Sequence, residues 1–262
     1  MPTLRDAIFG LAVGDALGVP YEFRPRGSFT CTGMVGYGTH DQPAGTWSDD
    51  TSMTLATCDS IRACGCVDTA DMLERFRAWI DGGAYAIDGV VFDYGNTTAR
   101  ALAAGTGCAG ERDNGNGSLM RIAPLAFTDA TDDEVRAVSA ITHAHPVSAE
   151  TCVEMVRVMR ALAAGASPAE AVPDYEVLLA ASEKDLGSGG FVRDTYCAAL
   201  WCLVVSGSYE ECVLRAVNLG DDTDTTAAVA GALAGIAYGA DAIPATWMEV
   251  LRGRDIIERC LF

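Results

Sequence analysis

The sequence predicts an all-α protein built as a single domain, and three observations support this fold class. Apolar residues recur at helical spacing through most of the 262-residue chain. No segment shows the strict alternation of apolar and polar residues that is typical of a half-buried strand. Half of the residues are hydrophobic, enough for a large core, and no linker or low-complexity stretch divides the chain. We therefore expect one domain over residues 1–262.

Two predicted helices carry glycines at a spacing of four. The first helix should begin at Thr3, a favourable N-cap, and its row consists of Gly10, Gly14 and Gly18. A late run of small and apolar residues, 227–239, has the same spacing at Gly231, Gly235 and Gly239. Since glycine lets two backbones approach closely, we expect these two helices to pack against each other.

Six further stretches have helical periodicity: 50–63, 69–80, 96–104, 148–164, 191–205 and a closing stretch over 246–261. Thr131 and Glu134 have the spacing of a capping box and predict a helix that ends near His143. Ser208 and Glu211 predict a second capping box.

Charge and composition disfavour several classes of protein. The net charge is −18 and no basic tract is present, so nucleic acids and anionic membranes are unsuitable partners. The N-terminus lacks the basic leader and apolar stretch of a signal peptide. The longest apolar run, 227–240, is shorter than the roughly 20 residues that span a bilayer. We expect a cytoplasmic monomer.

The ten cysteines do not suggest disulfides or zinc. Many lie within apolar stretches, where cysteine behaves as a small hydrophobic residue. The chain has no CxxC pair and only three histidines, which argues against a structural zinc site. We expect free thiols throughout.

Two acidic clusters precede helical patterns. One is DDTDTT, residues 221–226, and the other is SDDT, residues 48–51. Asp and Thr are common helix caps, but carboxylates with hydroxyls are also the oxygen ligands that Mg²⁺, Mn²⁺ and Ca²⁺ prefer. Residues two apart point to nearly opposite faces of a regular helix, so Asp222 and Asp224 converge only at a first turn or on an irregular stretch. The residues alone leave both interpretations open.

The two clusters occur together with three more motifs: GDALGVPYEF (14–23), DYGNTT (93–98) and NGNGSLMR (114–121). In this order the chain resembles the ADP-ribosylglycohydrolase family, which includes the dinitrogenase reductase-activating glycohydrolases. The resemblance covers residues 10–239, and FVRDTYCAALW (191–201) is similar to a segment of the bacterial members. It implies a compact all-helical domain with two divalent cations, Mg²⁺ or Mn²⁺, in a cleft.

The resemblance also implies roles for single residues. The positions that match metal ligands are Ser48, Asp49, Asp50, Asp222, Asp224 and Thr225. The positions that match the loop around the diphosphate are Gly115, Asn116, Gly117 and Ser118, and His143 matches a histidine near the substrate. Glu22 matches a glutamate beside the metals, and Asp93 matches an acidic residue that arginine-type bacterial members place near the scissile ribose. Asp221 should be a neighbour rather than a ligand.

The chemistry of an N-glycosidic bond is consistent with these roles. The bond breaks through an oxocarbenium-like ribose, so the site must hold the sugar, activate water and protonate the leaving nitrogen. Two cations about 3.5–4 Å apart can bind the ribose hydroxyls and lower the pKa of a water. Glu22 can orient that water or take its proton, and glycine N–H groups can hold phosphate without bulk.

Each candidate also has a structural alternative. Glu22 could be an ordinary surface glutamate, Asp93 a cap for the helix at 96–104, and His143 a helix-end histidine favoured by the dipole. Asp15, inside an apolar helix, is expected to anchor a buried hydrogen-bond network. His145, before a proline, is expected to be structural.

The sequence therefore predicts a metal-dependent hydrolase that removes ADP-ribose from a modified side chain, with arginine on a protein as the leading substrate. O-linked (serine) ADP-ribose and a small ADP-ribosyl metabolite remain alternatives, as does a non-enzymatic, crystallin-like relative. The dipeptide His40–Asp41 suggests a helical phosphohydrolase instead. That class usually needs more histidine ligands than this chain supplies.

Overall fold

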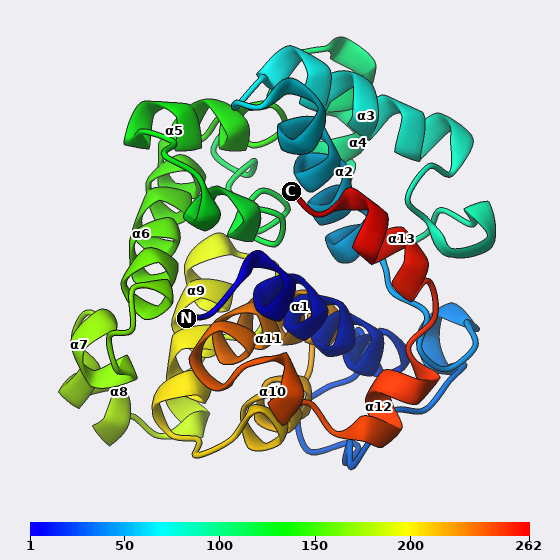
Figure 1. Cartoon of the computed structure of the whole chain (residues 1–262). Helices are drawn as coiled ribbons and strands as arrows, with labels where there is room; N and C mark the ends of the chain where they lie inside the picture. The colour runs from blue at the N-terminus through cyan, green and yellow to red at the C-terminus, as the bar shows by residue number, and fades with distance from the viewer.

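The first helix starts as the sequence predicts. The Thr3 hydroxyl accepts a hydrogen bond from the Asp6 amide, and the Asp6 carboxylate accepts one from the Thr3 amide at 2.7 Å. This capping box satisfies two of the free donors at the start of α1 (Leu4–Gly18). All residues of the chain, 1–262, are described by the computed structural model shown in Figure 1.

Helices make up nearly all of the regular structure. After α1 the chain forms α2 (Asp49–Cys64), α3 (Thr69–Gly82), α4 (Asn96–Ala104), α5 (Asp132–Ala140), α6 (Pro146–Ala163), α7 (Pro168–Ala171), α8 (Tyr175–Ala180), α9 (Val192–Val204), α10 (Tyr209–Asn218), α11 (Thr223–Tyr238), α12 (Ala245–Val250) and α13 (Arg254–Cys260). Only isolated β-bridges occur besides these helices and short 3₁₀ turns. The all-α prediction is confirmed.

The glycine rows bring α1 and α11 together at the centre of the molecule (Figure 1). A Cβ atom on Gly10 would lie 2.2 Å from the carbonyl oxygen of Gly231, and one on Gly235 would lie 2.2 Å from that of Asp6. No side chain fits at either position, so the predicted pairing is confirmed. Gly239 is the exception, because it ends α11 with a φ of 83° and has nothing packed against it.

The central helix α11 is buried over its whole length from Thr223 to Ile236. Because α1, α9 and α10 all pack against it, no polar face is needed, which explains its unbroken apolar run. The apolar side chains of these helices belong to one continuous core that extends into α2, α5 and α6. The first turns of α2 and α11 are thereby fixed in the interior.

Two helix ends differ from the prediction. The helix expected to end near His143 stops at Ala140, because the following turn pairs with another segment: the Cys108 amide donates to the Thr142 carbonyl at 2.9 Å. At α10 only half of the expected capping box forms. Ser208 accepts from the Glu211 amide, while the Glu211 carboxylate accepts from the amide of Gly207 instead.

The predicted closing helix over 246–261 is wrong as a single element. It is broken into α12 and α13 between Leu251 and Gly253. Gly253 adopts a left-handed φ of 61°, and a Cβ atom there would lie 2.4 Å from the indole ring of Trp47. The long-range contact with Trp47 therefore sets the break.

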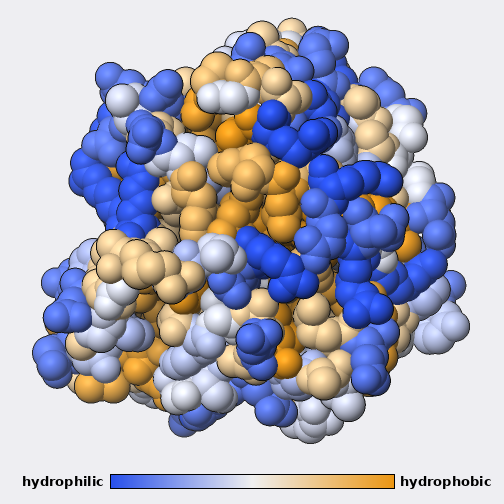
Figure 2. Space-filling model, in the orientation of Figure 1, coloured by the Kyte–Doolittle hydropathy of each residue, from blue (hydrophilic) through white to orange (hydrophobic).

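The surface is mixed in character. Hydrophilic residues border the face shown in Figure 2, and an apolar area lies at its centre near the C-terminus. A groove there is lined by Ile61, Phe127 and Phe262. All ten cysteines are free thiols, as expected. None of the helices combines the length and the apolar character that a bilayer-spanning segment needs.

Candidate active site

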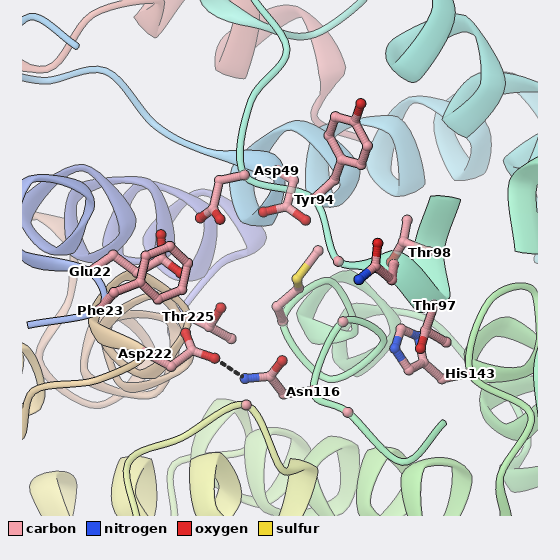
Figure 3. A pocket seen from close by; sticks show the side chains of 17 residues that line it. Glu22, Phe23, Asp49, Tyr94, Thr97, Thr98, Asn116, His143, Asp222 and Thr225 are labelled. Atoms are coloured by element: carbon pink, nitrogen blue, oxygen red, sulfur yellow. Dashed lines mark hydrogen bonds between the residues drawn. The ribbon is translucent and has the colours of Figure 1, made fainter. Parts of the chain in front are cut away.

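The sequence motifs converge on one open cavity of about 360 Å³ (Figure 3). Its wall combines the turn after α1, the first turns of α2 and α11, the segment before α4, and the glycine loop with His143. Four carboxylates line it: Glu22, Asp49, Asp93 and Asp222. No lysine or arginine side chain does. The cavity is therefore strongly acidic.

Asp15, on α1, holds the first turn of α2 in place. Its carboxylate accepts hydrogen bonds from the Ser48 amide at 2.9 Å and from the amide and hydroxyl of Thr51 at 3.0 and 2.6 Å. The prediction that Asp15 anchors a buried network is confirmed. Burial raises the pKa of Asp15 to about 6, against the effect of these hydrogen bonds. Asp15 thus positions the SDDT cluster.

The two predicted ligand clusters meet directly. Ser48 caps α2 by accepting from the Asp50 amide, and its hydroxyl donates to Asp50 Oδ2 at 3.2 Å. From the first turn of α11, the Thr225 hydroxyl donates to the same Asp50 oxygen at 3.2 Å. Ser48 therefore caps α2 and is also part of the predicted metal-binding cluster. Asp49 lies at the cavity wall, whereas Asp50 and Asp224 are fully buried behind it.

Several carboxylate oxygens in this cluster have no hydrogen-bond partner. The buried atoms Asp50 Oδ1, Asp222 Oδ1 and Asp224 Oδ2 are all unsatisfied, an expensive state for polar atoms in a folded interior. Oxygens of Glu22, Asp222 and Asp224 lie within 4.8 Å of one another. Burial and the neighbouring negative charges raise the pKa of Asp49 and Asp50 well above its usual range. An all-oxygen set of this kind fits hard divalent cations.

Glu22 is buried, with 4% of its surface exposed, so the surface-glutamate alternative is wrong. Its carboxyl group is hydrogen-bonded to His40 Nε2, and the same nitrogen lies 3.8 Å from Asp93 Oδ2. Burial, followed by the negative charge of Asp93, raises the pKa of Glu22 to about 10. His40 was not predicted as part of this site, because its distance from Glu22 along the chain carries no spacing signal.

Asp93 does not cap the following helix. The N-cap of α4 is Gly95, which has no side-chain cap bond, so the capping alternative is wrong. Asp93 has a left-handed φ of 52° and lines the cavity. Such a backbone conformation is strained for a residue with a side chain and is common at functional sites. Burial, followed by the negative charge of Asp93, raises the pKa of Asp224 well above its usual range.

The glycine loop lies beside the carboxylates and is tied to them. Asn116 Nδ2 donates to Asp222 Oδ2 at 2.9 Å (Figure 3) and to Thr195 Oγ1 at 2.8 Å. Gly115 and Gly117 line the cavity. The Ser118 side chain does not, because its hydroxyl is buried against Ser139 and Cys152 in the core. If Ser118 acts in the loop, it does so through its backbone.

The three histidines have separate partners. His143 lines the cavity on the side away from Glu22 and Asp49 (Figure 3), and its Nδ1 contacts the Thr142 hydroxyl at 2.9 Å. His145 is the N-cap of α6 and accepts from the Val147 amide, which confirms its structural role. Since His40 binds Glu22, no histidine cluster forms of the kind that the phosphohydrolase alternative requires.

Comparisons with known proteins agree on one family. The model of the ADP-ribosylglycohydrolase family matches residues 3–261. The chain is 34% identical to the ADP-ribosylarginine hydrolase Tri1 of Pseudomonas putida, over 94% of this chain and 73% of that protein. It is also 34% identical to the ADP-ribosyl-[dinitrogen reductase] glycohydrolase of Rhodospirillum rubrum, over 95% and 92%. A solved structure described as an ADP-ribosylglycohydrolase-related protein complex superposes with a TM-score of 0.82 at 31% identity, covering 98% and 95%.

Proposed function

The chain belongs to the ADP-ribosylglycohydrolase family and is a hydrolase, and from this premise we propose that it removes ADP-ribose from arginine side chains with the help of two divalent cations, Mg²⁺ or Mn²⁺. The expected substrate is an ADP-ribosylated protein. Two relatives, each 34% identical to this chain, carry names that specify ADP-ribosylarginine or ADP-ribosylated dinitrogen reductase. These names support the choice of substrate.

The observation that carries the arginine assignment is the surplus of carboxyl groups at the cavity wall. Glu22 and Asp93 both lie beside His40, and no lysine or arginine side chain lines the cavity to pair with them. A guanidinium group is the complementary leaving group, since it offers positive charge and several N–H donors to a carboxylate. A neutral serine hydroxyl would leave Asp93 unpaired.

The unsatisfied carboxylate oxygens support the cation part of the proposal. The residues that would hold the cations are Ser48, Asp49, Asp50, Asp222, Asp224 and Thr225. All offer oxygen, which suits Mg²⁺ and Mn²⁺ rather than softer metals. When bound, such cations supply positive charge that attracts ribose hydroxyls and lowers the pKa of a water.

Glu22 is the proposed acid–base group. It is buried beside the cluster, and its hydrogen bond to His40 holds the carboxyl group in one orientation. The pKa of Glu22 would fall beside the positive charge of bound cations, and its carboxylate would then take a proton from the water that attacks the anomeric carbon. As the carbon–nitrogen bond breaks, the electron pair remains on the guanidine nitrogen, and Glu22 returns the proton from the water to that nitrogen and is restored as a carboxylate. Asp93 would hold the guanidinium group in position throughout.

The diphosphate is proposed to lie on the opposite side of the cavity. Phosphate oxygens are repelled by the carboxylates around Asp49 and Glu22 and need donors elsewhere. The loop at Gly115 and Gly117 offers backbone without side chains next to His143 (Figure 3). This arrangement separates the charged ends of the substrate and would orient the scissile bond over the carboxylates.

A panel of conjugates tests the proposal. The purified protein is incubated with ADP-ribose linked to arginine, serine or cysteine, each with Mg²⁺, with Mn²⁺ or with a chelator. We expect release of ADP-ribose from the arginine conjugate with either cation and none with the chelator. Faster release from serine would overturn the arginine assignment, and undiminished release with the chelator would overturn the role of the cations.

A further inference from the structure

Arg121 is a buried cation without a carboxylate partner. Its side chain is fully buried, and its guanidinium group lies 4.5 Å above the ring of Phe76. It donates to the Val138 carbonyl at 3.3 Å and to the Thr142 hydroxyl at 2.8 Å, while its Nε has no partner. Burial lowers the pKa of Arg121 to about 10. A buried charge without a partner of opposite charge is destabilising. We therefore expect the Arg121 guanidinium group to have a specific role.

The contact with Thr142 determines the hydrogen-bonding state of the neighbouring histidine. A guanidinium group only donates, so the Thr142 hydroxyl oxygen accepts from Arg121. The hydroxyl still has one hydrogen to donate, and its other contact is His143 Nδ1 at 2.9 Å. Thr142 is fully buried. If Nδ1 carried the imidazole hydrogen, two donors would face each other and the hydroxyl hydrogen would have no acceptor. Nδ1 is therefore the acceptor, and Nε2 bears the hydrogen.

The Nε2–H group of His143 faces the glycine loop. A Cβ atom on Gly115 would lie 3.5 Å from this nitrogen, and one on Gly117 would lie 3.3 Å from it. No protein group accepts from Nε2, although the histidine is only 3% exposed. Burial and the positive charge of Arg121, opposed by Asp113, lower the pKa of His143 to about 3. The lowered pKa and an Nδ1 that accepts a hydrogen bond from Thr142 both favour the neutral ring at physiological pH.

We propose that Arg121 and Thr142 are positioning residues that hold His143 as the neutral Nε2–H tautomer, which donates a hydrogen bond to a phosphate oxygen of the ADP-ribosyl group. The tautomer follows from the protein alone, whereas the ligand rests on the proposed function. His143 then serves as a fixed donor and not as a general acid or base. The positive charge behind the ring further favours an anion at this point of an otherwise acidic cavity.

Nitrogen-15 NMR of the histidine side chains in the ligand-free protein tests the tautomer. We expect His143 to show a protonated Nε2 and an unprotonated Nδ1, unchanged between pH 5 and 8. On addition of ADP-ribose, the Nε2–H proton resonance should move downfield as the hydrogen bond forms. A protonated Nδ1, or a titration of His143 near pH 6.5, would overturn the tautomer assignment. A resonance that ADP-ribose leaves in place would overturn the phosphate contact.

Two variants at one position test the relay. Thr142→Val removes the hydroxyl at similar volume, and Thr142→Ser keeps it. We expect Thr142→Val to weaken ADP-ribose binding about tenfold, as for a lost hydrogen bond to a charged group, and Thr142→Ser to bind as the parent does. KM should rise more than kcat falls. Equal binding by both variants, with the tautomer lost only in Thr142→Val, would contradict the relay. A parent protein with the expected tautomer that cleaves no ADP-ribosyl conjugate would instead reject the proposed function and leave the relay intact.

Discussion

Asn116 Nδ2 donates a hydrogen bond to Asp222 Oδ2 at 2.9 Å across 106 residues of sequence. This single amide joins the loop proposed to bind the diphosphate to the carboxylates proposed to bind the cations. Its second hydrogen bond, to Thr195 on α9, fixes the amide from the other side. The two halves of the site are therefore joined through the side chain of Asn116, and a change in one is expected to affect the other.

Asn116→Ala tests this coupling. The variant leaves Asp222 without its donor and frees the loop, so the affinities for ADP-ribose and for Mn²⁺ should both fall several-fold. Isothermal titration calorimetry with each ligand measures them separately. Thr195→Val, which removes only the hydrogen bond between Asn116 and Thr195, is the matched control and should have a smaller effect. A loss of ADP-ribose affinity with unchanged Mn²⁺ affinity would contradict the coupling.

Asp50→Asn is expected to have opposite effects on activity and stability. Asp50 is fully buried, and burial together with the charge of Asp15 raises its pKa well above the usual range. Neutralising it should abolish hydrolysis and weaken divalent-cation binding. The same change should raise the melting temperature of the metal-free protein by a few degrees, because it removes repulsion. Asp129→Asn, on the surface, is the control and should change neither. Full activity in Asp50→Asn would reject the cation cluster.

The metal-free protein should lose stability as the pH rises. Folded carboxyls of raised pKa, such as Asp49 and Glu22, retain protons that the unfolded chain has released above about pH 4. Since the folded state then binds more protons, its stability falls with increasing pH up to the folded pKa. Thermal melts with chelator at pH 7 and 7.5, above the usual histidine pKa of about 6.5 and below the usual thiol pKa of about 8.5, measure the slope. Excess Mn²⁺ should flatten it. A slope of opposite sign in the chelated protein would contradict the assignment.

Gly117→Ala should impair substrate binding. A Cβ atom there would lie 2.7 Å from His143 Cε1 and 3.3 Å from Thr98 Oγ1, so the ring that faces the ligand must shift. We expect KM for an ADP-ribosyl conjugate to rise about tenfold or more while cation affinity stays within twofold of the parent. Gly189→Ala, at a glycine with open space around it, is the control. An unchanged KM for Gly117→Ala would remove this loop from the site.

Local patterns account for the features that the sequence predicts correctly. The pairing of α1 with α11 follows from glycines such as Gly10 and Gly231, because the same spacing on both helices permits one close approach. The Thr3 capping box depends on residues three apart. The two acidic clusters at the starts of α2 and α11, which meet through Asp50 and Thr225, stand out in the sequence because each is a short acidic motif before a helical pattern.

Long-range contacts account for the rest. The break before α13 depends on Trp47 packing against Gly253. No residue near 253 in the sequence indicates that the Trp47 ring packs there. His40 reaches Glu22 only because the short 3₁₀ helix at 38–40 packs against the one at 19–21 that follows α1. Ser118 follows the glycine loop in sequence, yet its side chain turns into the core. In each case tertiary packing decides a helix end or a side-chain orientation that local spacing leaves open.

The most direct test of the arginine assignment is the rate at which Asp93→Asn cleaves ADP-ribosyl-arginine. The substitution keeps the shape of the side chain but removes its charge, and asparagine tolerates the left-handed conformation of this position. With cation content and melting temperature shown to match the parent, we expect kcat/KM to fall by at least about 10²-fold. A variant that cleaves ADP-ribosyl-arginine as fast as the parent would contradict the pairing of Asp93 with the guanidinium group and remove the main support for an arginine substrate.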